Sequence, residues 1–486
     1  MFSLILSLFL SFQGISQDAP ASGLSPDTVK LRTRGTLPVA DSTARFIRIN
    51  RIFIIGNDIT RDRIIRRELS IQEGDVIYSS DLPAILAVEK KKLINTRLFN
   101  LVNIRTLELE KDQFDILIDL KERWYTFPSP IFDLADRNFN EWWQNYNHDF
   151  RRVNYGLRLY RYNMRGRNET LRFVAQFGYL KRFELSYRIP NLDPAQKHGI
   201  AFDFDYSEAR NVPYRTLNHK LVFHEFDSDT IHRQTRGAGI TYSFRNSFYD
   251  THFLKLDYRN NSISDVILAK NPNYLGEEER RQQYGVLSYI FTSDRRDYIA
   301  YPLRGYFFNS SISKSGLSAS DDLNKIEAAV NFSKYFELKN NFYLSNNTIG
   351  YISAPNKLSY YNYGALGYRR QFVRGYELYV IEGPAYFMNK TTFKKRLLSR
   401  NYHWGAMPFD KFRDIPLSIY VKTYADIGYV KNYDDYEAGK LLTNKLLSGF
   451  GGGIDIIGSY DLVFRFEYTF NIENERGFFF HIRKEF

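Results

Sequence analysis

The chain has 486 residues, no cysteine and a formal net charge of +12, and 17% of its residues are aromatic. The absence of cysteine excludes a disulfide scaffold, a cysteine-ligated zinc protein and a thiol enzyme. Beyond the N-terminus no apolar run approaches the roughly 18 residues of a transmembrane helix, which excludes a polytopic helical transporter.

A polar mean hydropathy of −0.43 accompanies 40 Phe and 37 Tyr. Transmembrane β-barrels combine these properties, because their strands alternate lipid-facing apolar residues with lumen-facing polar ones and carry aromatic residues at both interfaces. The basic residues are spread along the chain without the Lys/Arg-rich block of a nucleic-acid arm. The charge therefore favours lipid headgroups or acidic glycolipid over nucleic acid.

Residues 1–16 are predicted to form a secretory signal. The apolar stretch from Phe2 to Phe12 has the length of a signal-peptide core, although no Lys or Arg precedes it, and small residues follow at Gly14 and Ser16. We expect cleavage near Ser16 and export of the protein. Residues 17–44 are rich in Ser, Thr, Pro, Asp and Gly, which predicts a flexible leader.

Residues 45–125 are predicted to form one small α+β domain with the order β-α-α-β-β. The expected elements are a strand at Phe46–Ile55, a helix carrying Ile64, Ile65 and Leu69, a helix from Ser80, and strands at Leu98–Leu107 and Phe114–Leu120. Gly74 and Asp75 break the chain between the two helices. Residues 126–152 are expected to link this domain to the next.

Residues 153–486 are predicted to form a sixteen-stranded antiparallel transmembrane β-barrel, so the fold is mainly β. About sixteen alternating segments of roughly 9 to 15 residues are separated by Asn, Asp, Gly and Pro turns. The last three are Leu447–Ile457, Asp461–Asn471 and Arg476–Phe486. An even count suits a closed barrel, in which every backbone group is paired. A soluble sandwich or propeller is the alternative, disfavoured by the export signal and the terminal Phe.

Signals for catalysis, cofactors and metals are poor. None of the eight histidines pairs at metal-ligand spacing, and no G-x-S-x-G sequence occurs. Gly449, Gly451 and Gly453 do not form a dinucleotide loop, because Ile454 stands where a glycine is needed. Their alternation instead predicts room for an inward loop or a barrel bend. We expect no enzymatic activity, no cofactor and no metal.

Several segments carry a family resemblance, in chain order. They are Ile54-Ile55-Gly56-Asn57-Asp58-Ile59-Thr60, Arg97-Leu98-Phe99-Asn100-Leu101-Val102, Asp294-Arg295-Arg296-Asp297 with Pro302 and Gly305, Phe372-Val373-Arg374-Gly375-Tyr376, and Tyr424-Ala425-Asp426-Ile427-Gly428. Together they resemble the BamA/TamA outer-membrane assembly superfamily, which also contains two-partner-secretion transporters. The small domain resembles a single POTRA repeat of that superfamily.

The resemblance implies that Val373, Arg374, Gly375 and Tyr376 lie on a loop folded back into the barrel lumen. An arginine there needs a carboxylate partner, and Asp426 is the candidate. The superfamily often adds a glutamate on the strand after the loop, but residues 385–400 contain none. Glu377 or Glu382 is the expected substitute.

The C-terminal segment resembles the signal by which outer-membrane barrels are recognised for insertion. Phe478, Phe480, Ile482 and Phe486 share one face of the last strand, with Lys484 where an apolar residue is usual. In the superfamily the last strand pairs with the first, which we expect at Val153–Asn163, and this seam can open sideways.

The resemblance implies an outer-membrane protein with its POTRA domain in the periplasm, which assists insertion, assembly or translocation of other polypeptides. Its expected partners are unfolded outer-membrane or exported clients, periplasmic or lipoprotein accessory subunits, and outer-membrane lipids, with no nucleic acid. A single POTRA domain favours an accessory or specialised member. The alternative is a passive or substrate-specific channel that uses the POTRA domain for docking.

Overall fold

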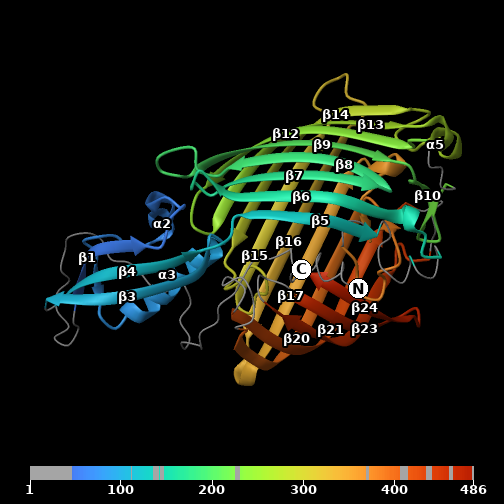
Figure 1. Cartoon of the computed structure of the whole chain (residues 1–486). Helices are drawn as coiled ribbons and strands as arrows, with labels where there is room; N and C mark the ends of the chain where they lie inside the picture. The colour runs from blue at the N-terminus through green and yellow to red at the C-terminus, as the bar shows by residue number, and fades with distance from the viewer. Residues whose placement is uncertain are drawn as a thin grey trace.

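The computed structural model describes residues 46–110, 112–134, 142, 147–224, 230–367, 371–404, 414–433, 441–458 and 463–483. It consists of a small N-terminal domain beside a large curved sheet (Figure 1). The predicted signal peptide, residues 1–16, and the leader, residues 17–44, lie outside the described residues and stay predictions.

The small domain contains a four-stranded sheet and two helices. Its elements are β1 (Phe46–Ile55), α2 (Asp62–Glu68), β2 (Val76–Tyr78), α3 (Leu82–Asn95), β3 (Phe99–Glu110) and β4 (Gln113–Glu122), and the strand order is β2-β1-β4-β3. β1 is parallel to β4 and antiparallel to β2. The helices bury an apolar core that includes Ile65, Leu93 and Ile118. The α+β character is confirmed.

The short strand β2 corrects the predicted β-α-α-β-β order. The sequence predicts only a break at Gly74 and Asp75, but the chain turns at Gly74, where φ is +93°, and then pairs with β1. Ile77, 6% exposed, joins the core opposite Ile47. Three residues are too few to show a period-two pattern, so the strand is visible only through its partner.

The large sheet has sixteen strands, which confirms the predicted number. In chain order they are β5 (Thr126–Leu134), β6 (Val153–Met164), β7 (Glu169–Gly178), β8 (Leu180–Ile189), β9 (His198–Ala209), β12 (Arg233–Arg245), β13 (Asp250–Ile263), β14 (Arg281–Asp294), β15 (Gly305–Ser315), β16 (Lys325–Glu337), β17 (Phe342–Ala354), β20 (Ala385–His403), β21 (Asp414–Lys431), β22 (Leu446–Ile457), β23 (Val463–Asn471) and β24 (Arg476–Arg483). Every neighbouring pair is antiparallel.

The first strand begins earlier than the sequence predicted. β5 lies inside the expected linker, residues 126–152, and pairs with β6, so Val153 begins the second strand of the sheet. Pro128 and Pro130 made this segment resemble a linker. Proline has no backbone N–H to donate, but an edge strand tolerates it on its free side. β5 is such an edge strand.

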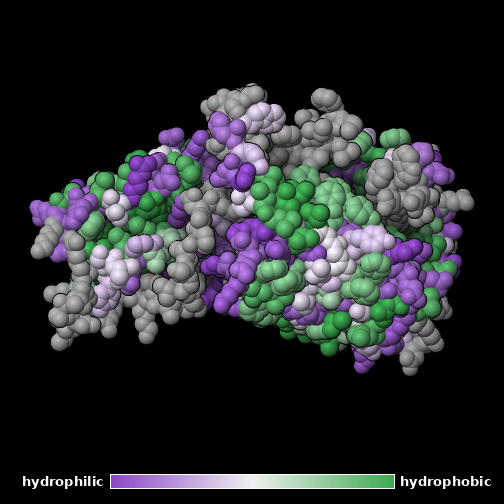
Figure 2. Space-filling view, turned by 90° about the horizontal axis from the view of Figure 1, so that it is seen from below, coloured by the Kyte–Doolittle hydropathy of each residue, from purple (hydrophilic) through white to green (hydrophobic). Residues whose placement is uncertain are grey.

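Alternation of side chains explains the polar mean hydropathy. On β13, Leu254, Leu256 and Tyr258 are nearly half exposed on the outer face, whereas the intervening Lys255 and Asp257 line an internal cavity. Hydrophobic side chains gather in patches on the outside of the sheet in Figure 2. The outer face therefore suits lipid, and the inner face suits water and buried charge.

Among the helices that the structure describes, none combines the length and apolar character required to cross a bilayer.

The loops at the end of the sheet away from the small domain form a cap (Figure 1). They carry β10 (Pro213–Leu217), β11 (Lys220–Phe223), α5 (Asp265–Lys270), η4 (Tyr360–Asn362), β18 (Ala365–Leu366) and β19 (Ile381–Glu382), while η2 (Phe150–Arg152) precedes β6 and η3 (Lys339–Asn341) precedes β17. Thr216 of β10 donates a hydrogen bond to Glu382 at 2.9 Å. The cap thus joins loops that are far apart in the sequence.

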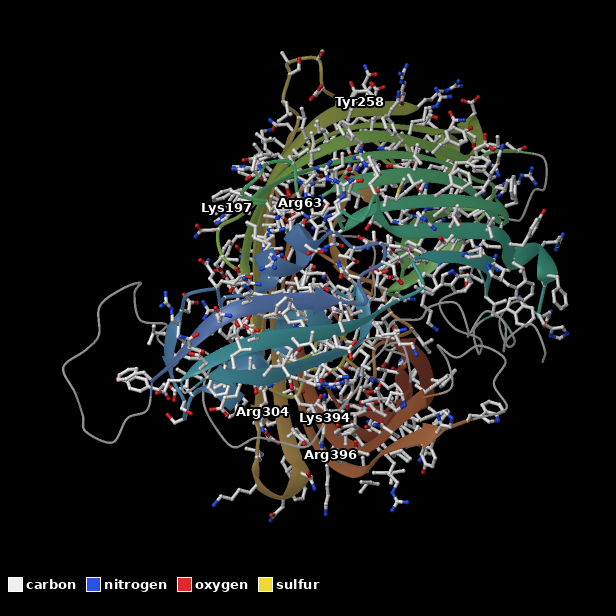
Figure 3. The ribbon with its side chains drawn as sticks, turned by 60° about the vertical axis from the view of Figure 1, so that its left-hand side comes forward. Arg63, Lys197, Tyr258, Arg304, Lys394 and Arg396 are labelled. Carbon is white, nitrogen blue, oxygen red and sulfur yellow. The ribbon has the colours of Figure 1, made fainter. Side chains whose placement is uncertain are left out.

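The small domain docks on the turns at the other end of the sheet. Glu68 accepts two hydrogen bonds from the Arg245 guanidinium at 2.7 and 2.9 Å. The Arg61 N–H donates to the Gly166 carbonyl at 3.0 Å, and Gln196 donates to the Arg63 carbonyl at 2.8 Å. Figure 3 shows Arg63 at this contact, close to the turn before β9. Three turns of the sheet therefore hold α2.

We predict that Glu68→Gln loosens this docking, because it replaces a charge-assisted pair of hydrogen bonds worth about 1.5–3 kcal/mol. Since the chain has no cysteine, spin labels at Leu107→Cys and Leu254→Cys report the distance between domain and sheet. The distance distribution should broaden. Asp119→Asn, which breaks the exposed Arg105–Asp119 pair, is the control and should leave it unchanged. An unchanged distribution in Glu68→Gln would contradict the prediction.

Candidate functional site

The segment Phe372–Tyr376 folds into the lumen between β17 and β20. Val373 and Tyr376 are 1% exposed and pack with Met388, Leu442 and other apolar side chains. The chain reverses at Gly375, whose φ of +94° favours glycine. Asn471 of β23 donates a hydrogen bond to the Gly375 carbonyl at 2.8 Å. The tip of the loop is therefore anchored to the barrel wall.

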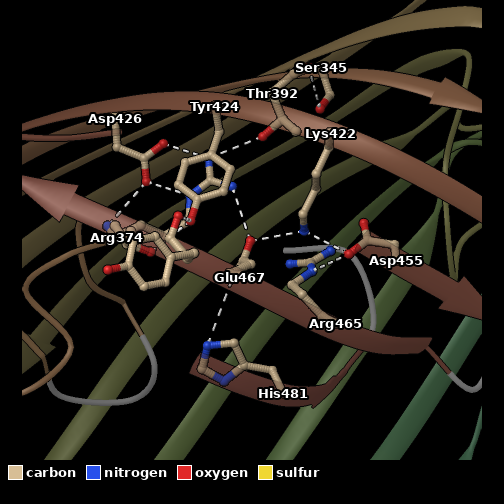
Figure 4. Close-up of polar contacts among 12 residues, drawn as sticks. Ser345, Arg374, Thr392, Lys422, Tyr424, Asp426, Asp455, Arg465, Glu467 and His481 are labelled. Atoms are coloured by element: carbon tan, nitrogen blue, oxygen red, sulfur yellow. Dashed lines mark hydrogen bonds and ion pairs between the residues drawn. The ribbon is translucent and has the colours of Figure 1, made fainter. Parts of the chain in front are cut away.

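Arg374 and Asp426 form a buried ion pair with a bidentate geometry (Figure 4). The Arg374 Nε donates to Asp426 Oδ2 at 2.8 Å, and Nη2 donates to Oδ1 at 2.5 Å. The backbone N–H of Arg374 also donates to Asp426 Oδ2, at 3.1 Å. One carboxylate thus holds both the side chain and the backbone of the loop. The structure brings these two predicted residues together.

The second carboxylate near Arg374 is Glu467 of β23, 3.4 Å from Nη1. The expected substitutes, Glu377 and Glu382, make other contacts: Glu377 accepts from the Gly375 N–H at 2.7 Å, and Glu382 accepts from Thr216. This expectation was wrong, because a residue close in sequence need not point toward the guanidinium. The sequence feature that could have identified Glu467 is a glutamate at a lumen-facing position of a barrel strand.

Two further groups complete the surroundings of Arg374. Thr392 of β20 accepts a hydrogen bond from Nη2 at 3.0 Å. The guanidinium lies over the Tyr424 ring, 3.7 Å from its centroid, an arrangement that favours a cation electrostatically. The loop arginine is therefore held by β20, β21 and β23 at once.

A second set of buried charges adjoins the first. Lys422 contacts Asp455 at 2.6 Å and Glu467 at 2.9 Å, and the Nε of Arg465 donates to Asp455 at 3.1 Å. Together with the Arg374–Asp426 pair, these side chains comprise three cations and three anions, and the buried Lys394 of β20 adds a further positive charge close to Asp455. Pairing makes burial of the six ions tolerable, because each has an opposite partner within hydrogen-bond distance or close to it. Glu467 connects the two sets.

Gly449 of β22 provides the space for the loop. A Cβ atom at Gly449 would lie 1.7 Å from the Arg374 carbonyl oxygen, a distance no side chain tolerates. A Cβ at Gly428 would lie 2.5 Å from Val373. The glycines of the wall thus permit close approach of the loop, one of the two explanations that the alternating glycines suggested.

Burial and charge set the ionisation of two loop residues. Burial alone lowers the pKa of Arg374, but Asp426 and Glu467 raise it above its ordinary value, so the guanidinium stays charged. Burial raises the pKa of Glu377 to about 7 from 4.5, against the lowering effect of hydrogen bonds from backbone N–H groups that include Gly375. The loop thus contains one permanent charge and one carboxyl that titrates near neutrality.

His219 joins the loop to the cap. It lies at the β10–β11 turn and is 1% exposed. Its Nε2 accepts the Leu442 N–H at 3.0 Å, and its carbonyl accepts the Val380 N–H at 2.8 Å. Burial lowers the pKa of His219, assisted by Lys445 and opposed by a hydrogen bond with the Val380 backbone. A neutral imidazole therefore links three loops, a role the sequence did not indicate.

The predicted C-terminal signal lies only partly within the described residues. Phe478 and Phe480 on β24 are 55% and 46% exposed and point outward. The side chain of Ile482 and the whole of Phe486 lie outside the described residues. The recognition role of this face stays a prediction.

The described part of the chain contains no group of three or more His, Asp or Glu side chains that could hold a metal ion.

The inner face of the sheet also encloses a cavity of about 840 Å³. Its lining combines tyrosines of the wall and the cap, among them Tyr284, Tyr351 and Tyr361, with serine hydroxyls and paired charges such as Lys325–Glu327. The lumen is therefore partly an open, polar-lined cavity and partly filled by the Arg374 loop.

Comparison with known proteins agrees with this architecture. The family described as "Omp85 superfamily domain" matches residues 163–486, and the POTRA family described as "Surface antigen variable number repeat" matches residues 47–123. No curated protein matches the chain in sequence.

Solved structures share the fold. Crystalline BamA from Haemophilus ducreyi lacking POTRA domains 1–3 is 17% identical with a TM-score of 0.50, over 90% of this chain and 83% of that chain. CdiB from Escherichia coli is 13% identical with a TM-score of 0.55, over 90% and 76% of the two chains. CdiB from Acinetobacter baumannii is 13% identical with a TM-score of 0.50, over 90% and 74%.

We predict that Gly449→Ala expels the Arg374 loop, because the added Cβ overlaps the Arg374 carbonyl; overpacking of this kind costs about 1–3 kcal/mol. A spin label at Leu378→Cys should become more mobile. Gly452→Ala on the same strand is the matched control, since its Cβ would meet only the Lys422 carbonyl at 3.4 Å. Equal label mobility in the two variants would refute the close-approach argument.

Glu377 gives the loop a pH dependence. Because its pKa of about 7 in the docked loop exceeds the solvated value of 4.5, the docked state binds the proton more tightly. Docking should be strongest below about pH 4.5 and weaken as the pH rises through 7, by up to about 3 kcal/mol. Label mobility at Leu378→Cys measures this. The same pH series on Glu377→Gln gives the contribution of the remaining groups, including His219, and the difference between the two series gives the contribution of the Glu377 carboxyl. A difference in which docking strengthens as the pH rises would disprove the assignment.

Proposed function

Because the chain belongs to the Omp85 superfamily, we propose that it inserts, assembles or translocates other polypeptides by presenting free strand edges to them. Omp85 proteins are outer-membrane β-barrels of Gram-negative bacteria that act in polypeptide assembly or translocation and are not enzymes. The POTRA domain contacts the unfolded client, and the terminal strands of the sheet receive it.

The observation that carries the proposal is the free edge at each end of the sheet. β5 and β24 are the terminal strands, and within the described residues neither pairs with the other. Unpaired backbone groups at a sheet edge are a template for another strand. The seam is therefore expected between β5 and β24 rather than at the predicted Val153–Asn163.

The small domain supplies a third edge at β3. Among the strands that the structure describes, this twelve-residue strand pairs with β4 alone, and it carries three exposed leucines, Leu101, Leu107 and Leu109. The opposite edge, β2, has only three residues. An extended client adds to a long edge more readily because it forms more backbone hydrogen bonds. We therefore assign β-augmentation to β3.

The Arg374 loop braces the wall next to the seam. Two of its contacts, Glu467 and Asn471, are on β23, the direct neighbour of β24. Anchoring β23 holds the strand with which β24 pairs, while the other edge of β24 remains free. The loop thus acts as a positioning element.

A channel with a docking domain is the second candidate, favoured by the cavity of about 840 Å³ in the lumen. The two functions differ in what Arg374→Ala should do. A channel carries large, steady, solute-selective currents in planar bilayers whether or not the loop is braced. An assembly or translocation protein depends on the loop, so its activity falls in the variant.

Photo-crosslinking tests the assignment of the three edges. A photoreactive amino acid is placed at Leu107 on β3, Phe132 on β5 or Phe480 on β24, all of which are exposed. Adducts with newly exported polypeptides should form at these three positions. Leu254, equally exposed but in the middle of the sheet, is the control and should capture none.

A second experiment depletes the protein and measures the abundance of other outer-membrane barrels and surface-exposed proteins. If the edge positions and the control capture the same polypeptides, the edges have no special role. If depletion lowers neither other outer-membrane barrels nor surface-exposed proteins, the proposed function fails.

A further inference from the structure

The turn between β14 and β15, residues 295–304, contacts both the small domain and the lumen. On the first side, Tyr298 packs against the apolar core of the small domain. Asn95 at the end of α3 donates a hydrogen bond to the Asp297 carbonyl at 3.4 Å. The turn is thus part of the surface on which the small domain docks.

The turn is internally rigid. The Asp297 Oδ1 accepts hydrogen bonds from the N–H groups of Tyr298, Leu303 and Arg304, at 2.9, 3.0 and 3.1 Å. At Gly305, where φ is +93°, a Cβ would lie 2.0 Å from the Arg295 carbonyl oxygen, so the two ends of the turn are closely packed. A displacement at one side of such a turn is transmitted to the other, because tightly packed groups cannot absorb it.

On the second side, Tyr301 enters the lumen. It is 3% exposed, and its hydroxyl donates to Asp455 Oδ2 at 3.0 Å. Its ring packs against Tyr420, with the centroids 5.0 Å apart. Tyr301 lies only three residues after Tyr298, so a short rigid segment connects the core of the small domain to a buried carboxylate of the barrel wall.

Two further buried charges connect Asp455 to the Arg374 loop. Asp455 contacts Lys422 at 2.6 Å, Lys422 contacts Glu467 at 2.9 Å, and Glu467 lies 3.4 Å from Arg374 (Figure 4). Each of these charges is at most 4% exposed. Their mutual positions therefore depend on one another rather than on water, because buried ions need their partners.

We propose that Tyr298 and Tyr301 are positioning residues that couple docking of the small domain to docking of the Arg374 loop. While the small domain is docked, the turn holds Tyr301 on Asp455, and the chain of charges keeps Arg374 in place. Displacement of the small domain withdraws Tyr301 and loosens the loop. Linkage makes the coupling reciprocal, so loosening the loop weakens docking of the small domain.

The coupling goes beyond the proposed function and is measured without any client. A spin label at Leu378→Cys in the full-length protein, folded into lipid nanodiscs, gives the mobile fraction of the Arg374 loop. Tyr298→Ala disconnects the turn from the small domain, and Tyr301→Phe removes only the hydroxyl on Asp455. Each should raise the ratio of undocked to docked loop by about fivefold or more. In the double variant the two effects should not multiply, because both interrupt one path.

Two controls separate positioning from general destabilisation. Tyr343→Phe removes a hydroxyl from the same aromatic cluster, where Tyr343 packs against Tyr420, and should leave the ratio unchanged. Heat-modifiable gel mobility reports whether each variant is folded. If Tyr298→Ala does not fold, Asn95→Ala replaces it, since this change removes only the contact with Asp297.

The reciprocal measurement uses the label pair at Leu107→Cys and Leu254→Cys. Arg374→Lys should broaden its distance distribution in the otherwise unchanged protein, and should cause no further broadening when Tyr301→Phe is already present. Effects of Tyr298→Ala and Tyr301→Phe that multiply, an immobile loop in either variant, or a Tyr343→Phe effect equal to that of Tyr301→Phe would each overturn the coupling. None of these outcomes depends on whether the protein handles clients.

Discussion

The buried ion pair between Arg374 and Asp426 is the interaction on which the arrangement of the lumen depends. A guanidinium that is 4% exposed must be neutralised where it lies, and removing one partner of such a pair costs about 3–5 kcal/mol. This requirement fixes Arg374 opposite Asp426 once the loop lies in the lumen, and Gly449 allows the loop backbone to reach the wall. Glu467 then connects the loop to Lys422 on a neighbouring strand.

A second constraint comes from the backbone. In lipid every backbone N–H and C=O must be paired, which a curved antiparallel sheet achieves everywhere except at its ends. Here the ends are β5 and β24, and the small domain adds the free edge of β3. In the proposed function, a client strand pairs with these free edges, so the part of the sheet that lacks backbone partners is also the part that we propose to act on the client.

Local patterns carried much of the fold and part of the site. Period-two alternation predicted the number of strands and the positions of most of them, and the small domain was recognisable from its apolar periodicity and motifs. Arg374 and Asp426 were found because each lies in a recognisable segment. β5 and β2 were missed because two prolines disguise the first, and the second has only three residues. Glu467 was missed because a single glutamate in a strand does not reveal which cation it faces.

By itself the sequence determined the alternating strands, the small domain and the need of a lumenal arginine for a carboxylate, because these follow from local period, composition and charge. Only the tertiary structure decided which groups meet. Arg374 is 52 residues from Asp426 and 93 from Glu467 along the chain, and Tyr301 is 154 from Asp455. Such contacts depend on strand register, on the inward fold of one loop and on the docking of one turn. None of these leaves a local pattern, because each results from packing between segments that are distant in sequence.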